Sequence, residues 1–98
     1  MRQLRTTTRF EKDYRKALKS GRDMTRLKRV MTWIATDQPL PDELRDHKLT
    51  GNYHGRRECH LAGDWLLIYK LEEHCVIFER TWIAFRTVSI TSRTAASS

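Results

Sequence analysis

The segment at residues 65–71, Trp-Leu-Leu-Ile-Tyr-Lys-Leu, most constrains the fold, because it is apolar at every position except Lys70. It has the length of a strand, and its continuous apolar character predicts a central strand that is covered on at least one side. Two further strand-like segments, residues 56–61 and 74–81, flank it. Glu72 and Glu73 join the central segment at 65–71 to the segment at 74–81, which predicts a tight hairpin.

Two amphipathic helical patterns precede these strands. In the first, Phe10, Tyr14 and Leu18 recur every four residues, and Thr8 and Glu11 have the spacing of a capping box. In the second, Asp23 can cap a helix whose apolar stripe is Met24, Leu27, Val30, Met31 and Ile34. Lysines and arginines occupy many of the intervening positions. The two patterns predict a helical hairpin with one buried face and one cationic face.

The remaining segments complete the predicted fold. Residues 2–7 can form a first strand with Leu4 turned inward, and residues 37–55 are rich in proline, glycine, aspartate and asparagine, as in a long irregular connection. The order of the elements predicts an α+β fold, in which an N-terminal strand and a helical hairpin pack on a small antiparallel sheet. We expect one domain at residues 1–90 and a weakly ordered tail at 91–98, where Thr-Ser-Arg-Thr-Ala-Ala-Ser-Ser offers little apolar surface.

Charge and hydropathy indicate the class of partner. The formal net charge is +7 over 98 residues, with a pI near 9.9, which favours a polyanionic partner such as nucleic acid or an acidic protein. The alternative is a basic protein without such a ligand. No run of 18 apolar residues occurs, and the first residues lack the apolar region of a signal peptide, so we expect a cytoplasmic protein with no membrane partner.

Two Cys-His neighbours, Cys59-His60 and His74-Cys75, raise the question of zinc. Adjacent residues of a strand point to opposite faces, so neither pair presents both ligands to one ion. The spacings typical of zinc sites are absent from the sequence. We therefore predict no metal site and no cofactor, and we interpret both cysteines as small buried residues without a disulfide.

A second chemistry fits the histidines better. Cleavage of RNA without a metal requires a base for the 2′-hydroxyl proton, an acid for the leaving 5′-oxygen, and cations near the phosphate. His47 in the long connection, His60 at a strand end and Asp64 just beyond it can converge at one edge of the sheet. The alternative is that all three are solvent-exposed polar residues.

The run Asp46–Leu71, DHKLTGNYHGRRECHLAGDWLLIYKL, followed by Phe-Glu-Arg-Thr at 78–81, resembles the YafQ branch of the RelE superfamily of toxins. The resemblance extends over about residues 1–81. It implies the fold predicted above and a ribosome-dependent mRNA endonuclease that works without a metal or cofactor. It also implies an acidic cognate antitoxin of the DinJ or RelB type, together with the ribosome and mRNA as partners.

The resemblance also implies roles for individual residues. His47 and His60 would transfer protons or contact the phosphate, Asp64 would hold or polarise one of them, and Trp65 would shape that corner of the site. The RNA phosphates would be contacted by cationic residues, namely Lys48, Arg56 and Arg80.

The resemblance stops after Thr81. In the family pattern the next residue is Gly, the one after it is Ser or Thr, and the third is a histidine that serves in proton transfer. A Phe follows four residues after that histidine. This chain has Trp82, Ile83 and Ala84, with Val88 at the Phe position. Loss of the histidine would impair cleavage.

A one-base frameshift accounts for this departure. The stretch from Thr81 to Ile90 can be encoded ACC TGG ATC GCA TTC CGA ACT GTT TCG ATA, followed by the first A of the Thr91 codon. Loss of the first T of TGG then gives Thr-Gly-Ser-His-Ser-Glu-Leu-Phe-Arg and a stop codon. The glycine is forced by the genetic code, whereas the other residues depend on codon choice. We interpret residues 82–98 as out-of-frame peptide. The alternative is a remodelled end, because Trp-Ile-Ala-Phe-Arg-Thr-Val-Ser-Ile can also form a strand.

Two other functions fit the same sequence. A catalytically dead homologue would retain binding to antitoxin and ribosome, and a ParE-like relative would poison a topoisomerase without cutting RNA. The set of His47, His60 and Asp64 favours the endonuclease over the topoisomerase poison.

Overall fold

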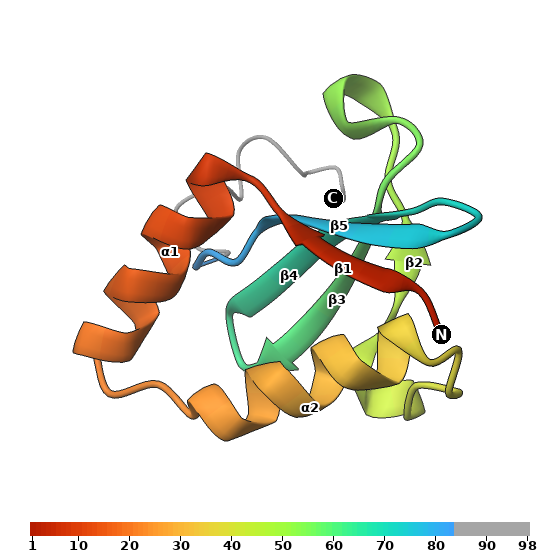
Figure 1. Cartoon of the computed structure of the whole chain (residues 1–98). Helices are drawn as coiled ribbons and strands as arrows, with labels where there is room; N and C mark the ends of the chain where they lie inside the picture. The colour runs from red at the N-terminus through yellow and green to blue at the C-terminus, as the bar shows by residue number, and fades with distance from the viewer. Residues whose placement is uncertain (84–98) are drawn as a thin grey trace.

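The computed structural model describes residues 1–83, which form two helices and a five-stranded sheet (Figure 1). The expected end of the domain at residue 90 and the expected tail at 91–98 lie outside the described residues. The helices and strands in chain order are β1 (Gln3–Thr6), α1 (Thr8–Lys19), α2 (Met24–Ala35), β2 (His47–Lys48), β3 (Arg57–Ala62), β4 (Trp65–Leu71) and β5 (Cys75–Arg80). Short 3₁₀ turns, η1 (Asp42–Leu44) and η2 (Gly51–Tyr53), flank β2. Neither helix is long or apolar enough to cross a membrane.

The sheet is mixed, so the prediction of a purely antiparallel sheet is wrong. Its strand order is β1-β5-β4-β3-β2, and β1 runs parallel to β5. Strands β3, β4 and β5 are antiparallel because short turns join them, and such turns allow no other direction. No turn links β1 to β5, because the rest of the described fold lies between them in sequence. Their relative direction is therefore set by packing. β2 was also not predicted, since it lies within the connection that we expected to be irregular.

The central-strand prediction for β4 is confirmed. Residues 65–69 of β4 are all buried, and Trp65, Leu67 and Tyr69 belong to one core with residues of both helices. The helices contribute Phe10, Ala17, Leu27, Val30, Ile34 and Ala35 to that core.

Two leucines that were expected inside lie outside. Leu18 is 58% exposed, because eight residues at 100° each carry it about 80° away from Phe10 around the helix. Leu4 is 44% exposed, although it lies beside the buried Val76, because β1 forms the edge of the sheet.

One of the two predicted helix caps is correct, and the other is shifted by one residue. Asp23 caps α2 as predicted, and its carboxylate accepts from Arg26 N at 3.1 Å. The cap of α1 is Thr7 rather than Thr8, and its hydroxyl accepts from Phe10 N at 3.0 Å. Either threonine has the required side chain, so sequence alone does not decide between them.

A buried ion pair ties α1 to the end of β5. The Asp13 carboxylate accepts two hydrogen bonds from the Arg80 guanidinium, at 2.7 and 3.1 Å, and one from Thr81 N at 3.1 Å. The Asp13 side chain is 10% exposed, and that of Arg80 is 20% exposed. The pairing raises the pKa of Arg80, chiefly through the hydrogen bonds to Asp13.

We expect Asp13→Ala to lower the free energy of unfolding by about 3 kcal/mol, because it leaves a largely buried cation without its partner. In a chain of this size that loss lowers the thermal midpoint by more than about 10 °C. Asp64→Asn is the matched control, since the more exposed Arg22–Asp64 pair at 3.8 Å contributes less than about 1 kcal/mol. Thermal unfolding followed by circular dichroism tests both variants, and equal effects would contradict the structural role of Asp13.

Candidate functional site

Strand register brings two of the predicted histidines together on one face of the sheet. His47 of β2 lies directly opposite Glu58 of β3, and His60 follows Glu58 by two residues, so all three side chains share a face. The His47 and His60 ring centroids are 6.1 Å apart. The residues that alternate with them, Cys59 and Leu61, point into the core that includes the helices. The histidines therefore lie on the face opposite that core.

The contacts of His47 fix the role of each ring nitrogen. Nδ1 lies 2.6 Å from the carbonyl oxygen of Arg45, and Nε2 lies 3.2 Å from the carboxylate of Glu58. A carbonyl oxygen only accepts, so Nδ1 is the donor in the first contact. The second contact is also a hydrogen bond when Nε2 carries a proton. The doubly protonated ring thus satisfies both contacts.

The environment of His60 favours the neutral ring. Burial lowers the pKa of His60, and the neighbouring His47 and Arg45 lower it further. A histidine with a lowered pKa is unprotonated at neutral pH and can accept a proton. His60 is therefore placed to accept a proton, and His47 can donate one from Nε2 when its ring is doubly protonated, as general acid–base chemistry requires.

Asp64 and Trp65 lie apart from this pair. The Asp64 carboxylate pairs with Arg22 at 3.8 Å, and the carboxylate that contacts a catalytic candidate is that of Glu58. Trp65 is 1% exposed, and the guanidinium of Arg22 lies 5.7 Å from its ring centroid. A cavity of about 500 Å³ adjoins this region, lined in part by Asp13, Arg22, Trp65 and Arg80.

The predicted phosphate-binding cations have different surroundings. Arg80 is held by Asp13 and lies 3.9 Å from the ring centroid of Trp82. Arg56 pairs with Glu79 at 2.9 Å. Lys48 is exposed, but it follows His47 in β2 and so points to the other face of the sheet. Contact of Arg56 or Arg80 with RNA would require the phosphate to compete with an internal carboxylate.

Sequence reasoning missed Glu58 and Arg45. The alternation of Glu58 and His60 along β3 was a usable signal for the first, because residues two apart in a strand share a face. Arg45 gave no comparable signal. It adopts a left-handed backbone conformation with φ 51°, which follows η1 and presents its carbonyl to His47. Within residues 1–83, no carboxylate pairs with the Arg45 side chain, so its charge is available near His60.

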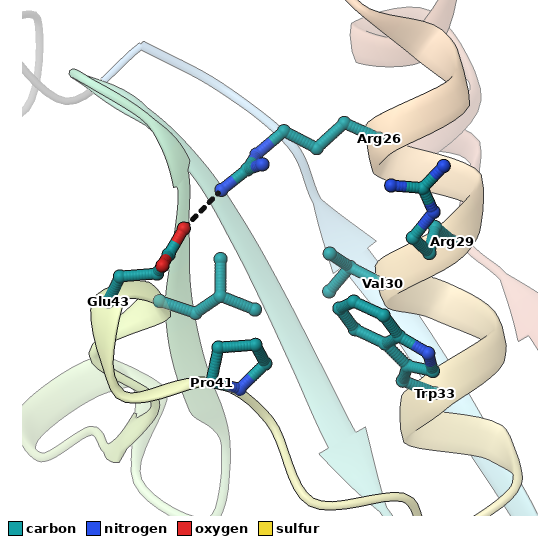
Figure 2. A pocket seen from close by; sticks show the side chains of 7 residues that line it. Arg26, Arg29, Val30, Trp33, Pro41 and Glu43 are labelled. Atoms are coloured by element: carbon teal, nitrogen blue, oxygen red, sulfur yellow. Dashed lines mark ion pairs between the residues drawn. The ribbon is translucent and has the colours of Figure 1, made fainter.

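A second, smaller hollow lies between α2 and η1, as Figure 2 shows. Its volume is about 50 Å³, and Arg26 pairs with Glu43 across it at 3.5 Å. Trp33, Val30 and Pro41 supply its apolar wall. It contains no histidine and is too small to receive a nucleotide, so it does not compete with the histidine pair as a catalytic site.

Comparison with known proteins links this geometry to one family. Residues 2–82 match the family model of the bacterial toxin of type II toxin–antitoxin systems, YafQ. The mRNA interferase toxin YafQ of Escherichia coli K12 is 42% identical over 73 residues, which are 74% of this chain and 79% of that protein.

Solved structures of toxins with the same fold agree with this family match. The YafQ chain in the E. coli DinJ–YafQ toxin–antitoxin complex has a TM-score of 0.79 and 37% identity, over 87% of this chain and 94% of that one. A metal-bound toxin from Helicobacter pylori has a TM-score of 0.82 and 34% identity, over 88% of this chain and 98% of that one.

Proposed function

This chain belongs to the YafQ family of toxins from bacterial type II toxin–antitoxin systems, and on that premise we propose that it is an mRNA interferase in which His60 and His47 move the protons. The observation that carries the proposal is the facing pair of imidazoles on the sheet, one favoured as neutral and the other placed between two acceptors.

The reaction balances with these two groups alone. Neutral His60 accepts the proton of the ribose 2′-hydroxyl, and the 2′-oxygen forms a bond to phosphorus. The bond from phosphorus to the 5′-oxygen breaks, and protonated His47 gives its proton to that oxygen. The products are a 2′,3′-cyclic phosphate and a free 5′-hydroxyl. The Glu58 carboxylate, 3.2 Å from Nε2 of His47, helps to orient that ring for the transfer.

Cations near the pair would stabilise the charge that develops on the phosphate. We assign this role first to Arg45, whose charge is close enough to His60 to influence its pKa. Lys48, Arg56 and Arg80 remain candidates, as the family resemblance implies. Asp64 and Trp65 would act at a distance from the proton transfers, beside the cavity that Arg22 and Arg80 line.

The proposed partners follow from charge and from the family. A net charge of +7, with exposed cations such as Arg15, Lys19 and Lys28 on the helices, suits the phosphate backbone of ribosomal RNA. The relative from E. coli is solved as a complex with the antitoxin DinJ. We propose that this chain likewise binds an acidic antitoxin in the cytoplasm, where it meets translated mRNA.

Primer extension on a translated mRNA tests the function. We expect cleavage products in a purified translation system supplied with the toxin, and none on the same mRNA without ribosomes. The proposed acidic antitoxin should suppress the products. A DNA gyrase supercoiling assay provides the opposing test, since inhibition of gyrase in the absence of mRNA cleavage would replace this proposal with a topoisomerase poison.

A further inference from the structure

A network of three polar side chains, Asp46, Arg57 and Tyr69, lies on the face of the sheet that packs against the helices. The Asp46 carboxylate accepts a hydrogen bond of 2.5 Å from the Tyr69 hydroxyl, and it accepts from Nη2 and Nε of Arg57 at 3.0 and 3.2 Å. Arg57 precedes Cys59 by two residues on β3 and lies opposite Tyr69 of β4. Both side chains therefore lie on the face of the sheet opposite the histidine pair.

Burial and charge make the bonds of this network strong. Tyr69 is 2% exposed, and the side chains of Asp46 and Arg57 are 23% and 28% exposed. Burial raises the pKa of the Tyr69 hydroxyl, and the hydrogen bond to Asp46 raises it further, so the hydroxyl keeps the proton that it donates. The hydrogen bond to Asp46 also raises the pKa of Arg57. Hydrogen bonds to an ionised partner are stronger than those between neutral groups, so two strands hold the one carboxylate firmly.

The strand that follows Asp46 is short. β2 consists of His47 and Lys48 alone, both residues are exposed, and the strand is the last in the order of the described sheet. At its far end, the hydrogen bond from Leu49 N to Arg56 O, at 2.8 Å, continues the pairing with β3. Asp46 stands at its near end. Because so short a ladder contributes little on its own, the side-chain network at the near end decides how firmly β2 is held.

We propose that Asp46 is a positioning residue for the cleavage reaction. Arg57 and Tyr69 hold its carboxylate, and the adjacent His47 is thereby kept beside His60, with their ring centroids 6.1 Å apart. Without the network, β2 would leave the edge of the sheet more often and carry its imidazole away from the scissile phosphate. A displacement of about 1 Å can cost about 100-fold in rate. This effect on cleavage rests on the proposed function, whereas the anchoring of β2 does not.

Amide hydrogen exchange of the full chain, followed by NMR, tests the anchor without an activity assay. We expect Tyr69→Phe to speed exchange of the Leu49 amide by about 10-fold, because it removes one hydrogen bond to a charged group and keeps the buried ring. Asp46→Asn should speed it at least as much, because it removes the charge that both donors share. The Ser20 amide, which donates to Lys16 O at the end of α1 at 3.0 Å, is the internal reference and should exchange as in the parent.

Single-turnover cleavage of ribosome-bound mRNA measures the effect on the reaction. Asp46→Asn and Tyr69→Phe should each lower the rate by about 10- to 100-fold and leave ribosome binding unchanged. A double-mutant cycle with His47→Ala separates positioning from folding. Because the network acts through His47, neither substitution should slow the His47→Ala chain further. Tyr14→Phe is the matched control, since it removes the hydroxyl of a half-buried tyrosine on α1, and it should cleave like the parent.

The two measurements separate this inference from the proposed function. Faster Leu49 exchange in a chain that never cleaves mRNA supports the anchor and overturns the proposed function. Unchanged Leu49 exchange in both Asp46→Asn and Tyr69→Phe overturns the anchor, even if the chain cleaves mRNA rapidly. If Tyr69→Phe slows cleavage in the His47→Ala chain as much as in the parent, the network does not act through His47, and the positioning role is wrong.

Discussion

Replacement of residues 82–98 by Gly-Ser-His-Ser-Glu-Leu-Phe-Arg is expected to raise the rate of ribosome-dependent mRNA cleavage by about 10²- to 10⁴-fold, the usual contribution of one positioned acid or base. The family match ends at residue 82, where the sequence departs from the pattern that contains the missing histidine. If a frameshift produced residues 82–98, this replacement restores the original C-terminus with its histidine.

The register of the sheet shows how near the end of the described chain lies to His60. Leu66 lies opposite His60, and on its other side its backbone pairs with Trp82 through two hydrogen bonds of 2.8 and 3.2 Å. Residue 82 therefore lies two strand spacings, about 10 Å, from His60. The family pattern places its histidine two positions later, at residue 84, which lies outside the described residues.

Two control proteins isolate the histidine. The same replacement with alanine in place of its histidine should remain as slow as the present chain, although its fold changes in the same way. The single substitution Ala84→His tests the histidine without loss of Trp82, which packs edge-on against Tyr53 and covers Arg80. If the present chain already cleaves as fast as the repaired one, the frameshift proposal has no functional meaning.

Features that depend on residues close in sequence were predicted correctly, whereas those that depend on contacts distant in sequence were not. The central strand and the Asp23 cap were predictable, because periodicity and capping depend on residues a few positions apart. The parallel pairing of β1 with β5 joins segments at opposite ends of the described chain. Local patterns carry no information about the relative direction of such a pair, so the prediction of an antiparallel sheet was wrong for β1.

The candidate site divides in the same way. His47 and His60 were identified by residue type, and their approach depends on the register of β2, a strand too short to show any periodicity. The same register places Glu58 opposite His47, which makes Glu58 part of the site. Asp64 was expected beside the histidines because it follows His60 closely in sequence, but the β3–β4 turn brings it to Arg22 instead. Residues that are close in sequence can therefore point to different parts of the molecule when a tight turn lies between them.

His60→Ala is expected to lower the cleavage rate by about 10²- to 10⁴-fold, because it removes the group that accepts the 2′-hydroxyl proton. The free energy of unfolding should change by about 1 kcal/mol or less, as for a half-buried polar side chain outside the core. Single-turnover cleavage of ribosome-bound mRNA by the chain with the repaired C-terminus gives the rate. Thermal unfolding gives the stability.

The pH profile distinguishes a base at position 60 from a residue that only supports the fold. Because burial lowers the pKa of His60, the cleavage rate should stay high as the pH falls toward the ordinary histidine value near 6.5. It should decline only at more acidic pH, as His60 becomes protonated. His60→Ala should lose this decline, and added imidazole should restore part of its rate. Asp64→Ala should keep the decline, because its carboxylate pairs with Arg22 rather than with either ring. If Asp64→Ala abolishes the decline and His60→Ala preserves it, the proton acceptor has been assigned to the wrong residue.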